Sequence, residues 1–178
     1  MPTYVAFLRA INLGAKRKFP KDAIKAAVET AGGRDVETYI NTGNVRLTTS
    51  LRSRTKVEAA LEKAFEADRG WAVPTIAFTP AELVGIAEDA ERLEAEHGEP
   101  QAHYVTLFKT PPPAVAVTAL AGAEFEGEQA YVEGRAAHAL LYRPFHESRL
   151  VTSKLFGALG QGTARNVTVV RTLADKWG

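Results

Sequence analysis

The chain has 178 residues, of which 46% are hydrophobic, so it can bury a core and form one large domain or two small ones. Its 22 basic and 21 acidic side chains nearly cancel, which excludes the overall basic field typical of proteins that bind nucleic acid or membranes. The absence of cysteine excludes disulfides, thiolate nucleophiles and zinc–thiolate sites.

Charge is distributed unevenly along the chain. The net charge is +6 over residues 1–54, −7 over 55–102, −2 over 103–142 and +4 over 143–178. The opening stretch MPTYVAFLRAINLG has no basic leader and no small-residue cleavage site, and it is too short to span a bilayer. We therefore expect a cytoplasmic protein with no membrane partner.

The first half of the chain alternates strand and helix signals. The apolar run at 3–10 predicts a buried strand, and apolar residues at helical spacing after Pro20 predict a helix that Gly32 and Gly33 close. Two β-rich runs within 35–49 flank Asn41-Thr42-Gly43-Asn44 and predict a hairpin. The remaining elements are a helix over 54–67, a strand over 71–79, and a helix that opens at the capping-box pattern Thr79-Pro80-Ala81-Glu82.

The second half repeats this order. The stretch HYVTLFKT (103–110) resembles TYVAFLRA (3–10) at an offset of 100 residues. A helix over 111–121, a hairpin around Gly134-Arg135, a helix over 148–159, an extended piece at 164–165 and a final helix follow. The sequence predicts an α+β fold, a tandem duplication of two ferredoxin-like βαββαβ units, each with a trailing helix, over residues 1–98 and 99–178.

The loop after the first strand distinguishes the two halves. Nine residues, INLGAKRKF, stand between Ala10 and Pro20, whereas Pro111 follows Thr110 directly in the second half. In a βαββαβ unit with strand order 4-1-3-2, this loop and the first hairpin lie at the same edge of the sheet. Arginine, lysine, amide and backbone N–H donors near a helix N-terminus favour a phosphate or carboxylate ligand. The converging residues are Arg9, Asn12, Gly14, Lys16, Lys18, Asn41, Gly43 and Asn44.

Each of these residues also has a structural interpretation. Asn12 can cap a turn, Asn41 and Asn44 can simply form the hairpin, and the basic run 16–18 can be a solvated loop face. Arg9 can form a salt bridge to Asp22 or Asp35. No phosphate-loop or dinucleotide-binding spacing is present.

Four motifs, YVAFLRAINLGAKRKFP, VETYINTGNVRL, SKL at 153–155 and TARNVTVVRTLADKW, resemble the bacterial family of domain of unknown function 1697 (DUF1697). Ala10, Thr42 and Val167 depart from its usual glycine, serine and tryptophan. The resemblance implies tandem ferredoxin-like units and carries no activity. The residues that it singles out are Arg9, Ile11, Asn12, Gly14, Lys16, Gly43, Asn44, Ser153, Lys154, Leu155, Arg165 and Asn166.

A second polar cluster is expected near the end of the chain. Arg165 and Asn166 could join Lys154 and Arg143 as further ligand-binding residues, or Asn166 could be the N-cap of the final helix. His97, His103 and His138 are scattered, and no pair has ligand spacing on a helix, so we expect no metal site and no cofactor.

The leading hypothesis is an uncharacterised protein that binds a small anionic or phosphorylated ligand at the loop and the facing hairpin. No general base stands out among these residues, so catalytic residues are unknown and binding is better supported than catalysis. One alternative is a nucleic-acid-binding module, which the basic ends of the chain would support. The other is a protein-interaction or dimerisation module. Both a monomer and a homodimer are compatible with the sequence. We expect the Tyr4 and Phe7 rings to lie in the core and not to stack on nucleic-acid bases.

Overall fold

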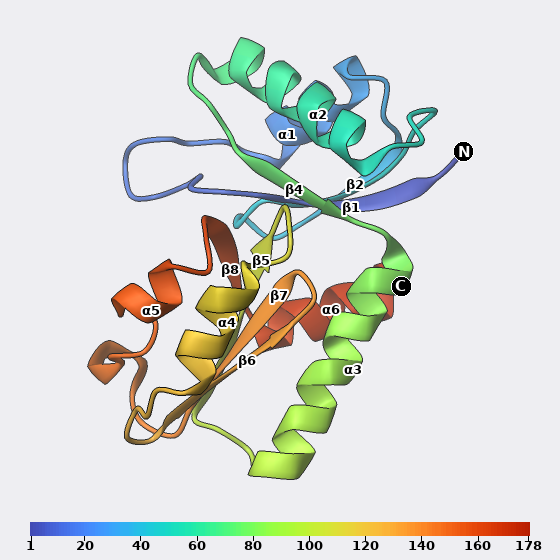
Figure 1. Cartoon of the computed structure of the whole chain (residues 1–178). Coiled ribbons are helices and arrows are strands. Elements are labelled where there is room, and N and C mark those ends of the chain that lie inside the picture. The colour runs from blue at the N-terminus through green and yellow to red at the C-terminus, as the bar shows by residue number, and fades with distance from the viewer. The chain divides into compact units, whose positions relative to one another are not determined.

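The computed structural model describes residues 1–178 and divides into two compact units. The first comprises Met1–Leu83 with Lys176–Gly178, and the second comprises Val84–Asp175. The division falls inside α3 (Pro80–His97), the long green helix of Figure 1. The predicted boundary at residue 98 follows the sequence repeat, whereas this division follows packing and assigns most of α3 to the second unit. None of the helices combines the length and the apolar character needed to cross a membrane.

The first unit is a four-stranded antiparallel sheet with two helices. The strand order is β2-β3-β1-β4, the order expected from the sequence. β1 ends at Leu8 and β2 ends at Tyr39. The loop after β1 and the β2–β3 hairpin therefore lie at the same edge of the sheet, beyond the ends of these two strands. The elements are β1 (Thr3–Leu8), α1 (Lys21–Thr30), β2 (Arg34–Tyr39), β3 (Asn44–Thr48), α2 (Arg54–Arg69) and β4 (Thr75–Phe78).

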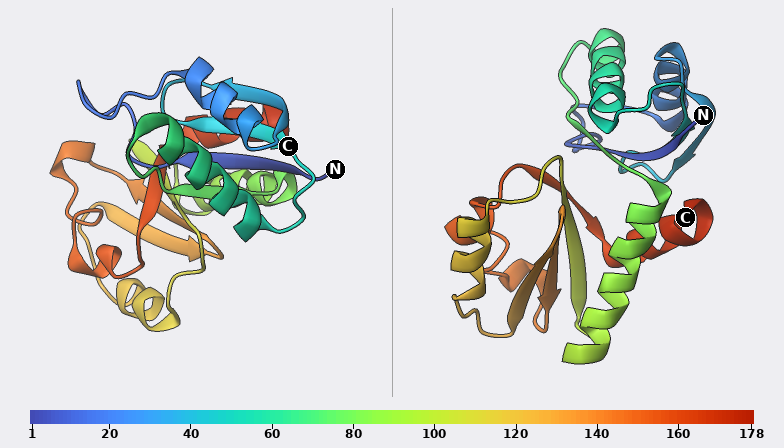
Figure 2. Two further views of the ribbon diagram at one scale, coloured as in Figure 1. Left: turned by 90° about the horizontal axis from the view of Figure 1, so that it is seen from above. Right: turned by 45° about the vertical axis from the view of Figure 1, so that its right-hand side comes forward.

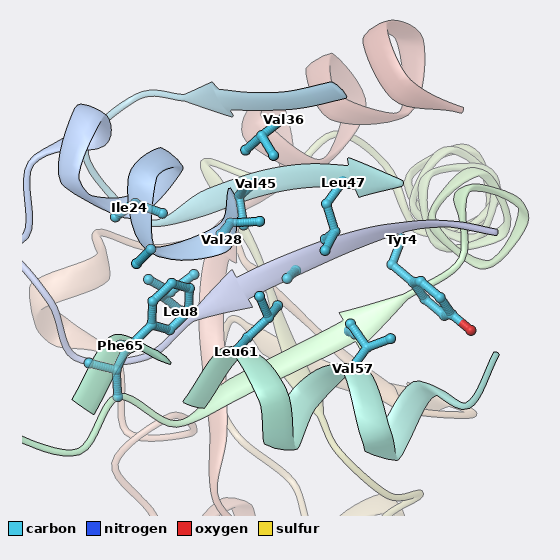
Figure 3. Packing of buried hydrophobic residues seen from close by; sticks show 14 of the residues in the cluster. Tyr4, Leu8, Ile24, Val28, Val36, Val45, Leu47, Val57, Leu61 and Phe65 are labelled. Carbon is cyan, nitrogen blue, oxygen red and sulfur yellow. The ribbon is translucent and has the colours of Figure 1, made fainter. Parts of the chain in front are cut away.

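The core of the first unit lies between the sheet and the two helices (Figure 3). Period-two alternation directs Tyr4, Ala6 and Leu8 of β1 toward the helices, while helical spacing directs Ile24 and Leu61 toward the sheet. Tyr4 is 5% and Phe7 is 0% exposed, so the prediction that both rings are core residues is confirmed and neither presents a face for a base.

The second unit has the same sheet topology. Its strand order, β6-β7-β5-β8, matches that of the first sheet element for element, and all neighbours are antiparallel. The fold is therefore α+β, as the sequence predicts (Figure 2). The elements are β5 (Ala102–Phe108), α4 (Ala114–Ala121), β6 (Glu128–Glu133), β7 (Ala136–Leu141), α5 (Lys154–Gly157), β8 (Gly162–Asn166) and α6 (Val167–Trp177).

The helix predicted over 148–159 is wrong in length. Within this segment the only helix is the four-residue α5, and a 3-10 turn, η1 (Phe145–Glu147), precedes it. The backbone N–H groups of Arg149 and Leu150 donate to the side chain of Glu128, at 3.0 and 3.2 Å, and so do not take part in a helix. Ser153 then starts α5 by accepting a hydrogen bond from Phe156 N–H at 3.1 Å.

The capping box predicted at Thr79 is confirmed. Thr79 N–H donates to Glu82 Oε2 at 2.7 Å, and Glu82 N–H donates back to Thr79 Oγ1 at 3.2 Å. These reciprocal bonds satisfy donors that the start of α3 would otherwise leave unpaired.

Candidate functional site

The loop after β1 meets the β2–β3 hairpin, and one side chain joins them. Asn12 Nδ2 donates to the backbone oxygen of Asn41 at 2.6 Å and to that of Phe19 at 3.1 Å. Its Oδ1 accepts the Phe19 N–H at 2.8 Å. Figure 1 shows this loop reaching beyond the end of β1 before the chain enters α1. The whole amide of Asn12 is used inside the protein, so this residue positions the loop and leaves no donor for a ligand.

The tip of the loop is shaped by backbone in the left-handed region. Asn12, Gly14 and Arg17 have φ values of 53°, 64° and 57°. The N–H of Asn12 donates to the oxygen of Arg17 at 2.8 Å, which closes residues 13–16 into a turn. Gly14 and Asn12 are residue types that adopt this conformation at low cost, so they specify the turn.

Arg17 holds the loop from inside, a role that the sequence did not reveal. Its Nε donates to Ala10 O at 2.7 Å, its NH2 donates to Ala72 O at 2.9 Å, and its guanidinium lies 4.4 Å from the centre of the Trp71 ring. Arg69 adds a bond of 3.2 Å to the backbone oxygen of Lys18. The middle residue of the basic run is therefore structural, and the loop is tied to the segment before β4.

Lys16 and Lys18, the other two residues of the run, extend from this tethered loop. Both are exposed, and neither pairs with an acidic side chain. The side chain of Asn41 is also exposed on the facing hairpin. The helix that follows, α1, has Pro20 at its N-cap and no side-chain cap. Positive charge, amide groups and uncapped backbone N–H groups thus occur along one short segment.

The hairpin residues are built into the fold. Gly43 is buried, with φ 86°, and its oxygen accepts the N–H of Leu8 at 2.8 Å. Asn44 is 1% exposed and its Nδ2 donates to Tyr39 O at 3.0 Å and to Thr42 Oγ1 at 2.8 Å. Both residues fix the shape of the turn.

Arg9 directly follows β1 and is half-buried. Its backbone N–H donates to Pro74 O at 2.9 Å, which continues the pairing of β1 with the β4 side of the sheet. The residue therefore lies where the strand becomes the loop, as its position in the sequence predicts.

The predicted second cluster is divided between the two edges of the second sheet. Arg165 lies in edge strand β8, is 6% exposed and donates to Thr163 Oγ1 at 2.8 Å; burial lowers its pKa to about 10. Arg143 bonds instead to Glu126 O at 3.2 Å, beside β6 at the opposite edge. Lys154 is exposed at the start of α5. Asn166 Oδ1 accepts the Thr168 N–H at 2.8 Å, which confirms the N-cap interpretation.

Two of the three histidines described as scattered are in fact in contact. His103 of β5 and His138 of β7 are joined by a hydrogen bond of 2.9 Å between Nε2 and Nδ1. Glu94 of α3 bonds His103 Nδ1 at 2.8 Å, and Arg171 of α6 donates to Glu94 at 2.6 Å. The available signal was one histidine in each of two mainly apolar strands.

Burial and hydrogen bonding together shift the pKa values of Glu94, His103 and His138. Burial would raise the pKa of Glu94, but hydrogen bonds from Arg171 and His103 hold it below its ordinary value. Burial lowers the pKa of His103 and lowers that of His138 to about 3. Because ionised Glu94 only accepts, His103 Nδ1 donates to it and its Nε2 accepts from His138 Nδ1. His138 Nε2 is then a buried lone pair without a partner.

Comparisons with known proteins support this fold and family. A family model described as "Protein of unknown function (DUF1697)" matches residues 1–138. The solved structure of the conserved bacterial protein SP0830 from Streptococcus pneumoniae is similar, with a TM-score of 0.73 and 17% identity over 99% of each chain. At that identity the likeness shows the fold alone. No curated protein matches the chain.

Proposed function

Because this chain belongs to the DUF1697 family of proteins of unknown function, its role has to be argued from its own residues, and we propose that it binds a small anionic or phosphorylated ligand. The proposed site is the edge of the first unit where the tip of the loop, residues 13–16, and Lys18 face the hairpin at Asn41. The observation that supports it most is that Lys16 and Lys18 are exposed and lack acidic partners on a loop that Asn12 and Arg17 fasten in place.

The eight predicted residues of this site divide by role in the proposal. Lys16, Lys18 and the Asn41 amide contact the anion, together with backbone N–H groups of the turn that Gly14 permits. Asn12, Gly43 and Asn44 position these groups, since their polar atoms are already bonded within the protein. Arg9 stands at the base of the loop as a further cation. A loop that is already held in one conformation loses less conformational entropy on binding than a mobile loop, which favours recognition of a small ligand.

Thermal denaturation in the presence of phosphate, pyrophosphate and nucleoside phosphates tests the proposal. A ligand present at about 100 times its Kd stabilises the folded state by about 2.7 kcal/mol, which raises Tm by several degrees. We expect at least one of these anions to do so for the natural sequence. The double substitution Lys16→Ala with Lys18→Ala should remove the rise.

Lys25→Ala is the matched control, because Lys25 is also an exposed lysine of the first unit and lies within α1, outside the loop. It should leave the rise in Tm intact. A Tm that no anion changes, or a rise that persists in the double variant, would contradict the proposed site.

A further inference from the structure

An open groove runs along the edge of the second sheet. Its volume is about 720 Å³, and its lining includes the four consecutive residues Glu128–Tyr131 of β6. Successive strand residues point to opposite faces of a sheet, so a cavity that contacts all four follows the edge of the strand. β6 is an edge strand because the order is β6-β7-β5-β8. Leu120 and Ala121, at the end of α4, form part of the opposite wall.

The pairing register shows which backbone groups of β6 point away from β7. Glu133 pairs with Ala136 across a two-residue turn in which Gly134 has φ 57°. The residues that flank such a turn form a hydrogen-bonded pair, and pair types alternate along an antiparallel ladder. Glu133, Tyr131 and Gln129 therefore bond to β7. Ala130 and Val132 direct their N–H and C=O groups away from β7, toward the open edge.

The apolar lining of the groove comes mostly from outside β6, and the groove is acidic at the end where β6 begins. Leu120, Phe125, Ala130 and Leu150 contribute apolar surface. The charged residues of its lining are Glu124, Glu126 and Glu128, and no lysine, arginine or histidine is among the residues that line it. A smaller cavity of about 350 Å³ adjoins the same glutamates and carries Arg143 and Arg149 on its wall.

Glu128 gives this acidic end a fixed feature. The residue is 5% exposed, and its Oε2 accepts hydrogen bonds from the backbone N–H groups of Arg149 and Leu150 at 3.0 and 3.2 Å. Its Oε1 is buried and has no hydrogen-bond partner. A buried carboxylate oxygen without a donor is costly, and a cationic group beside it would relieve that cost.

We propose that the β6 edge binds an extended peptide segment that carries a lysine or arginine, by addition of a strand to the second sheet. The free N–H and C=O groups of Ala130 and Val132 supply the main-chain pairing. The apolar wall at the end of α4 receives side chains from one face of the added strand. The exposed Glu124 and Glu126 receive the basic side chain, close to the charge of buried Glu128, so charge selects the partner. This site lies in the second unit and is independent of the proposed anion site.

Selection from a displayed library of random decapeptides on the full chain tests the proposal. We expect enriched peptides that contain lysine or arginine and alternate apolar residues. Fluorescence anisotropy of the labelled, selected peptides should show a Kd at least about tenfold higher for Ala130→Pro than for the natural sequence. Proline removes the outward N–H and obstructs the edge of the strand. Ala130 N–H is not part of the ladder to β7, so the variant should retain its fold, which circular dichroism checks.

A charge variant tests the same surface without a change of backbone. Glu126→Lys should weaken binding by a similar factor of about ten. Glu99→Lys makes the same change of charge at an exposed residue of the second unit outside the groove, and should alter binding less than about twofold. Bound peptide should also slow hydrogen exchange at the Ala130 and Val132 amides.

Three results would overturn the proposal. The first is the absence of enrichment over an unrelated protein, and the second is binding that survives both Ala130→Pro and Glu126→Lys. The third is a dimer, seen by light scattering of the natural sequence and abolished by Ala130→Pro, since this would assign the edge to a second copy of the chain.

Discussion

Single residues in the first loop and hairpin have backbone conformations that explain why particular residue types occur there. Ala10 has φ 56°, in the left-handed region that costs an L side chain about 1–2 kcal/mol. The family pattern that the sequence resembles has glycine at this position. The structure gives a conformational reason for that glycine.

Ala10→Gly should therefore stabilise the protein slightly. Relief of about 1–2 kcal/mol of backbone strain is partly offset by the greater entropy of glycine in the unfolded chain, about 0.4–1 kcal/mol, so a net gain of up to about 1 kcal/mol is expected. Ala15→Gly, at an exposed loop residue outside the left-handed region, should instead destabilise by about 0.5 kcal/mol. Urea denaturation measures both, and a loss of stability in Ala10→Gly would contradict the strain.

Gly43 and Gly14 form a matched pair for a second test. Both have positive φ, but a Cβ on Gly43 would lie 2.8 Å from Leu8 Cβ and 2.9 Å from Ile11 Cδ1, whereas a Cβ on Gly14 meets nothing within 4 Å. Gly14→Ala should cost about 1–2 kcal/mol of unfolding free energy from backbone strain alone. Gly43→Ala should cost about 2–4 kcal/mol, because steric overlap adds to the strain. Equal losses in urea denaturation would show that the hairpin yields to the added methyl group.

At the scale of elements, the sequence correctly predicted the features that depend on residues adjacent in the chain. The capping box at Thr79 and the turn around Gly134 depend on a few adjacent residues, and both were found where expected. The meeting of the loop with Asn41 followed from sheet topology. The inward role of Arg17 could not be predicted, because its partners Trp71 and Ala72 lie more than fifty residues away in the sequence.

Long-range pairing also explains two further misses. The helix expected after residue 148 is shortened where Arg149 and Leu150 bond to Glu128, more than twenty residues earlier in the chain. The contact of His103 with His138 requires the register of β5 with β7, which no single stretch of sequence specifies.

The lowered pKa of His138 predicts that acid destabilises the folded protein. Its pKa is about 3 in the folded protein against an ordinary value of 6.5, so between these values the unfolded chain binds a proton that the folded chain does not. The stability contributed above pH 6.5 is therefore lost progressively as the pH falls toward 3. At pH 5 the loss should be about 2 kcal/mol relative to pH 7.5.

Denaturant midpoints at the two pH values measure this loss. His138→Leu should reduce the difference between pH 7.5 and pH 5, whatever its effect on absolute stability, and the difference that remains is due to His103, whose pKa burial also lowers. His146→Gln is the control, because the His146 side chain is 81% exposed and should leave the difference unchanged. Parallel pH dependence in the natural sequence and His138→Leu would contradict the role given to the buried imidazole.

On the scale of the whole molecule, the chain presents two units of the same sheet order with different polar features. The first unit carries the basic loop, and the second carries the buried histidine pair and the acidic edge groove. The likeness to the S. pneumoniae protein at 17% identity shows that this fold persists when most residues have changed. Apolar patterning and turn chemistry therefore specify the fold, and we propose that the loop after β1 and the β6 edge carry this chain's own binding chemistry.

A titration of isotope-labelled protein with pyrophosphate, followed through amide chemical shifts, tests most directly whether the loop after β1 binds anions. We predict saturating shifts at the amides of residues 13–16 and at Asn41, and essentially none across residues 102–175. Shifts that fail to saturate, or that centre on the second unit, would contradict an anion site at this loop.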